Sequence, residues 1–263
     1  MGFEGQTVWI TGASSGIGEA LAGVFARLGA RLVLSARREG ELERVRAGLP
    51  RADAHRVVAF DVADEEAVAA AAREVLADGR RLDVLVLNAG ITQRALARDT
   101  ALAVDRRLFD VDFFGPVALA KAVLPAFRAQ GGGRIVVVSS LVGKVGTPLR
   151  SGYAASKHAL HGFFESLRAE EHAAGVRVTM AMPGFIRTPL PITALTGDGS
   201  PQGRMDRAQL EGMAPEECAE RIVRAVARGK DEVLVGGKER WVVPLARLSP
   251  GLVRRILRRA RVT

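Results

Sequence analysis

The chain contains a single tyrosine, Tyr153, and a lysine stands four residues later, at Lys157. Residues four apart share one face of a helix, so both side chains can point toward one site. A free phenol has a pKa of about 10, so a tyrosine that acts as a base near neutral pH needs a neighbouring cation that favours phenolate. In the reducing direction, the same phenol donates a proton to a carbonyl oxygen. Such pairs also occur on ordinary amphipathic helices, and the spacing alone does not establish an enzyme.

Ser140 is a third candidate for the same chemistry. It ends the apolar run "RIVVVSS", residues 134–140, which has the composition of a buried strand. A hydroxyl at the end of such a strand can hydrogen-bond a carbonyl oxygen as that oxygen gains negative charge. Ser140, Tyr153 and Lys157 together therefore favour interconversion of a ketone and a secondary alcohol.

The stretch "TGASSGIG" follows the first apolar run of the chain and precedes a helix-like segment. Its TGxxxGxG spacing differs from both the GxGxxG fingerprint and the P-loop. Glycines let the chain turn sharply and approach a pyrophosphate, and the following helix offers N–H groups and its positive dipole end. An ordinary tight turn is the alternative, but the position in the first strand–helix unit favours nucleotide binding. The cofactor-binding candidates here are Gly12, Ser14, Ser15, Gly16, Ile17 and Gly18.

Two arginines follow the second apolar run, which ends "LSARRE". A site that prefers NAD carries an acid near this point for the ribose 2′-hydroxyl, whereas arginine meets the 2′-phosphate of NADP. Ala36 occupies the position of the acid, and Arg37 and Arg38 come next. NADP(H) is therefore expected in preference to NAD(H). A solvated helix start is the other interpretation, and it suits Arg38 better than Arg37.

Seven apolar, β-branched runs alternate with longer helix-like segments along the chain. Near-continuous apolarity indicates strands covered on both faces, and the alternation indicates one doubly wound parallel sheet. The expected fold class is α/β, a Rossmann-type seven-stranded sheet flanked by helices in a single domain over residues 1–263. The expected strands are Thr7–Thr11, Arg31–Ser35, Arg56–Phe60, Asp83–Asn88, Arg134–Ser140, Arg177–Met182 and Glu232–Gly236, and the expected crossover helices are Glu19–Leu28, Glu65–Ala77, Leu102–Gln130, Tyr153–Ala174 and Pro215–Arg228.

Composition bounds the class of protein and its partners. The chain has 263 residues, 48% of them hydrophobic, and a formal charge of +9. Six arginines and no acid lie between Arg247 and Arg261, so this segment accounts for +6 of that charge. One cysteine, Cys218, excludes an internal disulfide, and with four histidines no metal site is expected. The chain shows no signal-peptide pattern and no apolar run near the roughly 20 residues of a membrane span, so a cytoplasmic location is expected.

Together these motifs resemble the short-chain dehydrogenase/reductase family. The resemblance rests on "TGASSGIG", "DV" at 61–62, "NAG" at 88–90, Ser140, "YAASK" at 153–157 and "PGFIRT" at 183–188, in the family's order. It implies that Tyr153 is the acid/base, that Lys157 favours its phenolate and holds the nicotinamide ribose, and that Ser140 orients the substrate. The further cofactor contacts that it implies are Asp61 and Val62 at the adenine, Asn88, Ala89 and Gly90 beside the sheet, and Pro183, Gly184, Ile186 and Thr188 on the nicotinamide side.

The chain departs from the family pattern at Asp112. The family has a catalytic asparagine in the context "NffGp", and the matching run here is "VDFFGP". The asparagine helps to bind a water through its backbone carbonyl, and that role survives the change. An ionised Asp112 would, however, compete for the ammonium of Lys157.

Two segments are expected to determine what the protein contacts beyond its cofactor. The loop at about 189–212, a polar, Gly/Pro-containing segment that interrupts the strand–helix rhythm, is expected to select the substrate together with the residues around 141–150. Its sequence and that of 143–170 are similar to the animal membrane-associated branch containing the seven-B member and acyl-dihydroxyacetone-phosphate reductases, which implies a lipid-like or bulky apolar ketone.

The segment at about 240–263, if helical, places apolar residues opposite arginines. A basic amphipathic helix is typical of a peripheral membrane contact, and packing on the protein body is the alternative. The stretch at 242–263 contains no aromatic residue to stack on bases, and the rest of the chain is nearly neutral, so no nucleic-acid partner is expected. The expected apolar residues are Leu252, Val253, Ile256 and Leu257, and the expected arginines are Arg254, Arg255, Arg258, Arg259 and Arg261.

Two classes of function follow from these features. The first is an NADP(H)-dependent oxidoreductase acting on a small carbonyl or alcohol substrate, which the resemblance implies to be a homodimer or homotetramer assembled through the long helices at 102–130 and 153–174. The second is a non-catalytic NADP-binding regulator that acts through its basic tail. Ser140, Tyr153 and Lys157 favour the enzyme, while Asp112 is the feature that fits the regulator.

Overall fold

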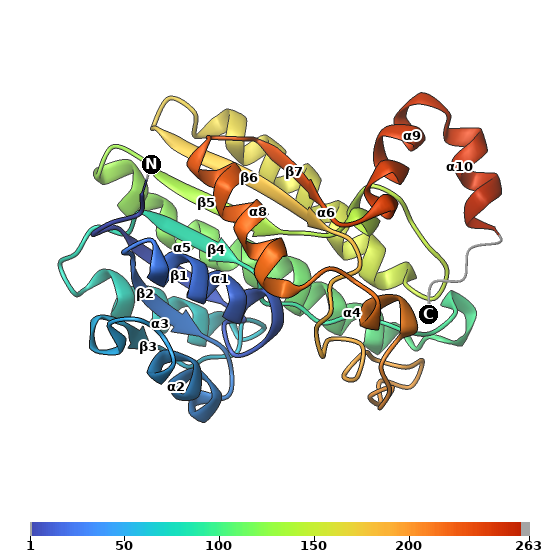
Figure 1. The fold of residues 1–263 in the computed structure, drawn as a ribbon, viewed down its shortest axis with the longest axis horizontal. Helices are drawn as coiled ribbons and strands as arrows, with labels where there is room; N and C mark the ends of the chain where they lie inside the picture. Colours follow the sequence, from blue (N-terminus) through green and yellow to red (C-terminus); the bar gives the residue numbers. More distant parts are fainter. Residues whose placement is uncertain (1, 259–263) are drawn as a thin grey trace.

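Seven parallel strands form one sheet in the computed structural model, which describes residues 2–258 (Figure 1). The strand order is β3-β2-β1-β4-β5-β6-β7. The predicted fold class, a single α/β domain with a doubly wound parallel sheet, is confirmed. The strands are β1 (Thr7–Thr11), β2 (Arg31–Ser35), β3 (Arg56–Val57), β4 (Val84–Leu87), β5 (Gly133–Val138), β6 (Val176–Pro183) and β7 (Glu232–Val235).

The order of the strands reverses at β1, which pairs with β2 on one side and β4 on the other. In an open α/β sheet, ligands bind outside the carboxyl ends of the strands at such a switch point. The glycine turn follows β1, and Asn88 follows β4, so both lie at this point of the sheet. The topology therefore fixes the location of the candidate site before any side chain is considered.

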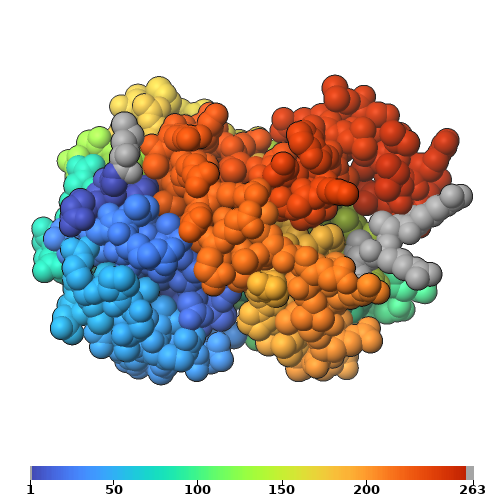
Figure 2. Space-filling view, viewed as in Figure 1, coloured from blue at the N-terminus to red at the C-terminus, as the bar shows by residue number. Residues whose placement is uncertain are grey.

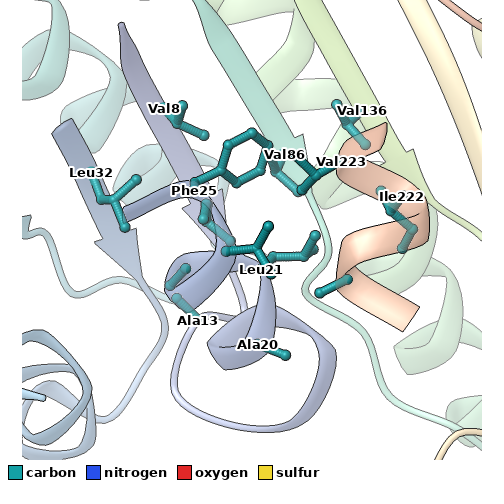
Figure 3. Packing of buried hydrophobic residues seen from close by; sticks show 14 of the residues in the cluster. Val8, Ala13, Ala20, Leu21, Phe25, Leu32, Val86, Val136, Ile222 and Val223 are labelled. Atoms are coloured by element: carbon teal, nitrogen blue, oxygen red, sulfur yellow. The ribbon is translucent and has the colours of Figure 1, made fainter. Parts of the chain in front are cut away.

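Successive side chains of a strand point to opposite faces of the sheet, and here both faces are apolar. Helices therefore cover both faces and form a core on each. In β1, Val8 and Ile10 join one core, and Trp9 joins the other. Figure 3 shows the first core, in which Leu21 and Phe25 of α1 meet Ile222 and Val223 of α8. The first face carries α1 (Gly16–Arg27), α2 (Glu39–Ala47) and α8 (Pro215–Ala227), and the second carries α3 (Glu65–Leu76), α5 (Gly115–Ala129) and α6 (Ser151–Glu170).

Two of the predicted strands and crossover helices differ clearly from the structure, which also contains the unpredicted helix α2. The segment expected to be one helix over 102–130 is α4 (Leu102–Phe109), a five-residue π-helix η3 (Asp110–Phe114) and α5. The predicted strand at 56–60 is reduced to the two residues of β3, at the edge of the sheet. Residues 58 and 60 still donate backbone hydrogen bonds to the β2 side, so the chain stays extended beyond the assigned strand.

The C-terminal part of the described chain forms two short helices rather than one amphipathic helix. The turn η5 (Lys238–Trp241) leads into α9 (Val242–Leu248) and α10 (Pro250–Leu257), which lie at the end of the molecule away from α2 and α3 (Figure 1). Of the predicted apolar stripe, Val253 is buried against the body and Leu257 packs beside it, while Leu252 and Ile256 are exposed. The predicted arginines Arg259 and Arg261 lie outside the described residues.

The remaining short elements lie in the connections between strands and helices. Among residues 2–258, none of the helices combines the length and the apolar character that a membrane crossing requires. The short elements are η1 (Ala52–Ala54), η2 (Ala97–Asp99), η4 (Leu141–Gly143) and α7 (Arg207–Leu210).

Candidate active site

The first turns of α6 carry Tyr153 and Lys157 beside the carboxyl end of β5. Lys157 is buried, and its Nζ lies 5.7 Å from the centre of the Tyr153 ring. The helix start is held in place by a buried amide, because the backbone N–H of Gly152 donates to Oε1 of Gln93 at 3.0 Å. Tyr153 itself packs in a small apolar cluster that includes Leu195. The tyrosine and the lysine therefore share one face of a helix whose N-terminus is fixed to the neighbouring loop.

Ser140 lies directly after β5, on the same side of the sheet. Its hydroxyl donates to the carbonyl of Pro183 at 3.2 Å and accepts from the backbone N–H of Val142 at 3.4 Å. The residue is half-buried and lines the same cavity as Tyr153 and Lys157. Because a hydroxyl rotates freely, Ser140 can turn its hydrogen from Pro183 to an oxygen bound in the cavity at the cost of one hydrogen bond.

Asp112 lies in the π-helix η3 and is completely buried behind Lys157. Its Oδ1 accepts from the backbone N–H of Ile91 at 2.8 Å and lies 4.0 Å from Nζ of Lys157, and its Oδ2 lies 3.5 Å from the hydroxyl of Ser156. Burial raises the pKa of Asp112 to about 6, against the opposing effects of Lys157, the Ile91 amide and Ser156. This carboxyl group therefore titrates close to physiological pH in contact with the lysine.

A buried pair fixes α6 against β5 behind these residues. The hydroxyl of Ser139 lies 3.1 Å from Nε2 of His161 and donates to the backbone carbonyl of Lys157 at 3.4 Å. Burial lowers the pKa of His161 to about 4, and the nearby Lys144 acts in the same direction. His161 is therefore a neutral ring at pH 7. It does not line the cavity, and it is linked to the backbone of Lys157 through Ser139.

The glycine turn after β1 is built for close approach of backbone to backbone. Gly12 has φ +66°, and a Cβ there would lie 2.8 Å from Cα of Ala89. A Cβ on Gly18 would overlap the carbonyl oxygen of Gly12. Asn88 joins β4 to this turn, since its Nδ2 donates to the carbonyls of Thr11 at 3.0 Å and Gly12 at 3.2 Å. These contacts fix the turn against β4, and residues 14–17 at the N-terminus of α1 line a cradle of the cavity that fits a dinucleotide.

The far end of this cradle carries the two arginines that follow β2. Arg37 and Arg38 are exposed, and Nη1 of Arg37 lies 4.0 Å from Oδ2 of Asp61. Ala36 stands where an acid for a ribose 2′-hydroxyl is expected. Both arginines and Asp61 border the same cavity as the glycine turn, so the structure brings this set together.

One cavity of about 1230 Å³ joins the glycine turn to Tyr153. Two predicted site residues, Gly18 and Asp112, lie behind its wall instead of on it, the first as a packing contact and the second as the partner of Lys157. The predicted site residues that line the cavity are Gly12, Ser14, Ser15, Gly16, Ile17, Arg37, Arg38, Asp61, Val62, Asn88, Ala89, Gly90, Ser140, Tyr153, Lys157, Pro183, Gly184, Ile186 and Thr188.

Sequence reasoning missed a cluster of buried charges at the other end of this cavity. Arg94 and Arg150 line the wall, and both approach the carboxylate of Asp206, at 2.7 Å and 3.8 Å respectively. These three residues are far apart in the sequence, and no spacing or motif links them. They meet because the loop at 189–212 folds back along the segment after β4, where the backbone N–H of Arg94 donates to the carbonyl of Leu195.

Comparison with known proteins agrees with this geometry. Residues 6–196 match the family model described as short chain dehydrogenase. The chain is 45% identical over 241 residues to "Dehydrogenase/reductase SDR family member 7B" of Xenopus tropicalis, an alignment that covers 89% of this chain and 78% of that protein.

Two solved structures share the fold over nearly their whole length. A short-chain dehydrogenase from Burkholderia cenocepacia in complex with NADP has a TM-score of 0.82 at 25% identity, covering 98% of this chain and 99% of that one. A short-chain dehydrogenase/reductase from Burkholderia phymatum in complex with NAD has a TM-score of 0.79 at 26% identity, covering 97% and 93%. The chain belongs to the short-chain dehydrogenase/reductase family and is an NAD(P)-dependent oxidoreductase of that family.

Proposed function

We propose that this protein is an NADP(H)-dependent oxidoreductase that interconverts a ketone and a secondary alcohol. The observation that carries the proposal is that Ser140, Tyr153 and Lys157 line the same cavity as the glycine turn. A bound dinucleotide would be held by the glycine turn and α1 at its pyrophosphate and by Lys157 at its nicotinamide ribose. The nicotinamide supplies or accepts the hydride when it is bound.

In the reducing direction, Tyr153 donates its phenolic proton to the carbonyl oxygen of the substrate. Lys157 favours the phenolate that remains, because its ammonium is buried beside the ring and is little screened by water. Ser140 turns its hydroxyl from Pro183 to the same oxygen and stabilises the negative charge that develops there. In the oxidising direction, the phenolate of Tyr153 removes the proton of the alcohol.

The preference for NADP(H) is supported by the end of β2. Arg37 and Arg38 are exposed there, and no acid occupies the position of Ala36, so a 2′-phosphate would meet two cations. Asp61, 4.0 Å from Arg37, can hold that guanidinium in place. Calorimetric titration with NADPH and NADH tests this part of the proposal, and tighter binding of NADH would contradict it.

A lipid-like or bulky apolar ketone is supported by the walls of the cavity near Tyr153. Apolar side chains from the loop at 189–212, from η4 and from the C-terminal helices gather there, and they would bury a large apolar substrate. A panel of aliphatic, steroid and acyl ketones with NADPH tests the reaction and its range. Binding of NADPH without turnover of any ketone would favour the non-catalytic regulator instead. The apolar lining residues are Val145, Leu190, Ile192, Leu195, Val242 and Leu257.

A peripheral membrane contact through η5, α9 and α10 forms part of the proposal, with the protein otherwise in the cytoplasm. Trp241 and Leu248 are exposed, Leu248 by 86%, and Leu252 and Ile256 add further exposed apolar surface. Arginines alternate with these residues, which suits a surface of anionic lipids. Val253 and Leu257 pack on the body, and Leu257 also lines the cavity. Only Leu252 and Ile256 of the apolar stripe are therefore accessible to a membrane.

A homodimer or homotetramer assembled through α4, α5 and α6 completes the proposal. Leu102 at the start of α4 and Phe114 at the end of η3 are large exposed apolar residues on this surface, by 63% and 55%. Such residues are often covered by a second copy in an oligomer. Light scattering measures the mass in solution, and Phe114→Glu should shift it toward the monomer. An unchanged oligomer would remove this surface from the interface.

A further inference from the structure

Arg94 is a buried cation in the wall of the cavity that also holds Tyr153. Its side chain is 3% exposed, and its Nε donates to Oδ2 of Asp206 at 2.7 Å. Its Nη1 donates to the hydroxyl of Thr92 at 3.0 Å and to the carbonyl of Gln93 at 2.6 Å. Among residues 2–258, Nη2 makes no hydrogen bond. Two N–H groups of a rigidly held guanidinium therefore remain for a ligand in the cavity.

Arg150 brings a second guanidinium to the same place. Its Nη2 lies 3.8 Å from Oδ2 of Asp206, the oxygen that accepts from Arg94. Burial lowers the pKa of Arg150 to about 10, and the charge of Arg94 acts in the same direction, while Tyr153 and Asp206 oppose them. Arg150 is three residues from Tyr153 and immediately precedes α6. Two guanidinium groups, with the carboxylate of Asp206 between them, are thus grouped beside the residue that is proposed to transfer the proton.

We propose that Arg94, supported by Arg150, forms an anion-binding subsite that selects ketones carrying a carboxylate or phosphate group. This inference rests on the proposed oxidoreductase function and names the class of its substrate. The carbonyl would lie at Ser140 and Tyr153, the apolar part of the substrate against Leu195 and its neighbours, and the anionic group at Arg94. A planar guanidinium offers paired N–H donors that match the oxygens of either anion.

A purely structural role for Arg94 would be to anchor the loop at 189–212 through Asp206. That role uses Nε and Nη1, and it does not require the residue to line the cavity or to keep Nη2 unused. Because Arg94 lines the cavity, an anionic ligand bound there could accept hydrogen bonds from Nη2. Buried charges that are held by a second charged group are also pre-organised for binding, because little side-chain entropy is lost when the ligand arrives.

Equilibrium binding tests the subsite independently of turnover. Calorimetry on the protein saturated with NADP⁺ would compare octanoate and heptyl phosphate with methyl octanoate, three ligands with the same heptyl chain. We expect the wild-type protein to bind at least one of the two anions at least tenfold more tightly than the ester. The two anions also show which oxyanion the subsite prefers. Equal affinity for all three ligands would overturn the proposal.

Two variants then assign the preference to Arg94. Arg94→Met should abolish the difference between anion and ester, and Arg94→Lys should keep the buried charge beside Asp206 while losing most of the preference. Arg94→Met leaves Asp206 buried with one guanidinium fewer, so Arg94→Lys provides the test if the first variant does not fold. Arg98→Met is the matched control, since Arg98 lies in η2 with a side chain that is 79% exposed. A preference that persists in both Arg94 variants would refute the proposal.

Turnover separates this inference from the proposed function. With NADPH, an oxo-acid and its methyl ester should differ in kcat/KM by at least tenfold, and the Arg94 variants should lose this ratio through KM while retaining turnover of the ester. If no ketone is reduced, the proposed function fails, and the binding data still decide whether the anion subsite exists. An equal loss of kcat/KM for acid and ester in Arg94→Lys would show that Arg94 only anchors the loop.

Discussion

At the scale of single residues, the contact between Asp112 and Lys157 is the feature that most affects the chemistry. The two groups lie 4.0 Å apart, and both are buried. When Asp112 is ionised, its charge offsets part of the positive charge that favours the phenolate of Tyr153. When it is protonated, Lys157 acts on the phenol alone. Since burial raises the pKa of Asp112 to about 6, the balance between these states changes just below neutral pH.

Asp112→Asn should therefore retain or increase reductase turnover, and it should speed alcohol oxidation most at pH values above about 6. Rates of NADPH oxidation and NADP⁺ reduction measured from pH 5 to 9 check this. The wild-type rate should change with pH near pH 6, and this change should be absent in the variant. A collapse of activity with intact folding would contradict the account and would give Asp112 an acid/base role of its own.

The same substitution should change the dependence of stability on pH. The folded-state pKa of Asp112, about 6, lies above its ordinary value of 3.8, so the folded protein binds this proton more tightly than the unfolded chain does. Ionisation thus opposes folding, and the cost grows as pH rises from about 4 to 6 and is fully present above that range. Relative to wild type, Asp112→Asn should gain up to about 3 kcal/mol in free energy of unfolding between pH 4 and pH 8. Denaturant titrations at the two pH values measure this gain. If the variant and the wild type differ in free energy of unfolding by the same amount at both pH values, the prediction is wrong.

Arg37 governs the proposed choice between the two nicotinamide cofactors. Arg37→Met should weaken NADPH binding by roughly tenfold and leave NADH binding nearly unchanged, since a charge-assisted hydrogen bond contributes about 1.5–3 kcal/mol. Calorimetry with both cofactors measures the change. Arg27→Met, at the end of α1, is the matched control for loss of one arginine. Equal weakening of both cofactors would mean that Arg37 does not read the 2′-phosphate.

At the scale of elements, the strand–turn–helix unit from β1 to α1 was predictable from sequence, because glycine spacing and apolar runs are local signals. The doubly wound sheet was predictable from the repetition of such units. The positions of Ser140 and Tyr153 were predictable from the strand and the helix that carry them. The π-helix η3 was not predictable, since one extra residue in a helical turn leaves no period in the sequence. The cluster of Arg94, Arg150 and Asp206 was missed for another reason, because only the folded loop at 189–212 brings it together.

The packing of α1 on the glycine turn gives a test at this scale. Gly18→Ala should lower the free energy of unfolding by about 1–3 kcal/mol, because the added Cβ overlaps the carbonyl of Gly12. It should also weaken NADPH binding, since the turn must move. Gly40→Ala is the matched control within α2, where an added Cβ meets nothing within 4 Å, and it should leave stability unchanged or raise it by up to about 1 kcal/mol. Thermal unfolding of both variants measures these changes. A loss of stability in Gly18→Ala alone would show that the close approach of the backbone, and not helix propensity, requires glycine at position 18.

At the scale of the whole molecule, the C-terminal helices pack one side on the body of the protein and leave apolar residues exposed on the other. Val253 packs into a core cluster with Leu141 and Met182, so part of the segment belongs to the body of the protein. Leu252 and Ile256 stay exposed on the other side of α10. In the space-filling view, these helices (red) form one end of the molecule beside the gold-to-orange segment that includes residues 189–212 (Figure 2). A membrane contact at this end would lie close to the proposed substrate loop.

The double variant Leu252→Glu/Ile256→Glu should sediment less with vesicles that contain anionic lipid, because it removes exposed apolar area and adds two negative charges. Turnover of a water-soluble ketone should remain, since neither residue lines the cavity. Leu28→Glu, an exposed apolar position at the end of α1, is the control for a surface outside this end of the molecule. Vesicle binding that is unchanged in the double variant would contradict a contact through α10.

The central claim is that Tyr153 transfers the proton in an NADPH-dependent reduction of a ketone. The most direct measurement is the single-turnover rate of NADPH oxidation with the best ketone substrate, for wild type and Tyr153→Phe, together with the Kd of NADPH for each. We expect the variant to lose about 10²–10⁴-fold in rate while its Kd for NADPH changes by less than threefold, because the phenolic hydroxyl acts on the substrate oxygen. A loss of less than tenfold in rate, with NADPH still bound, would contradict it.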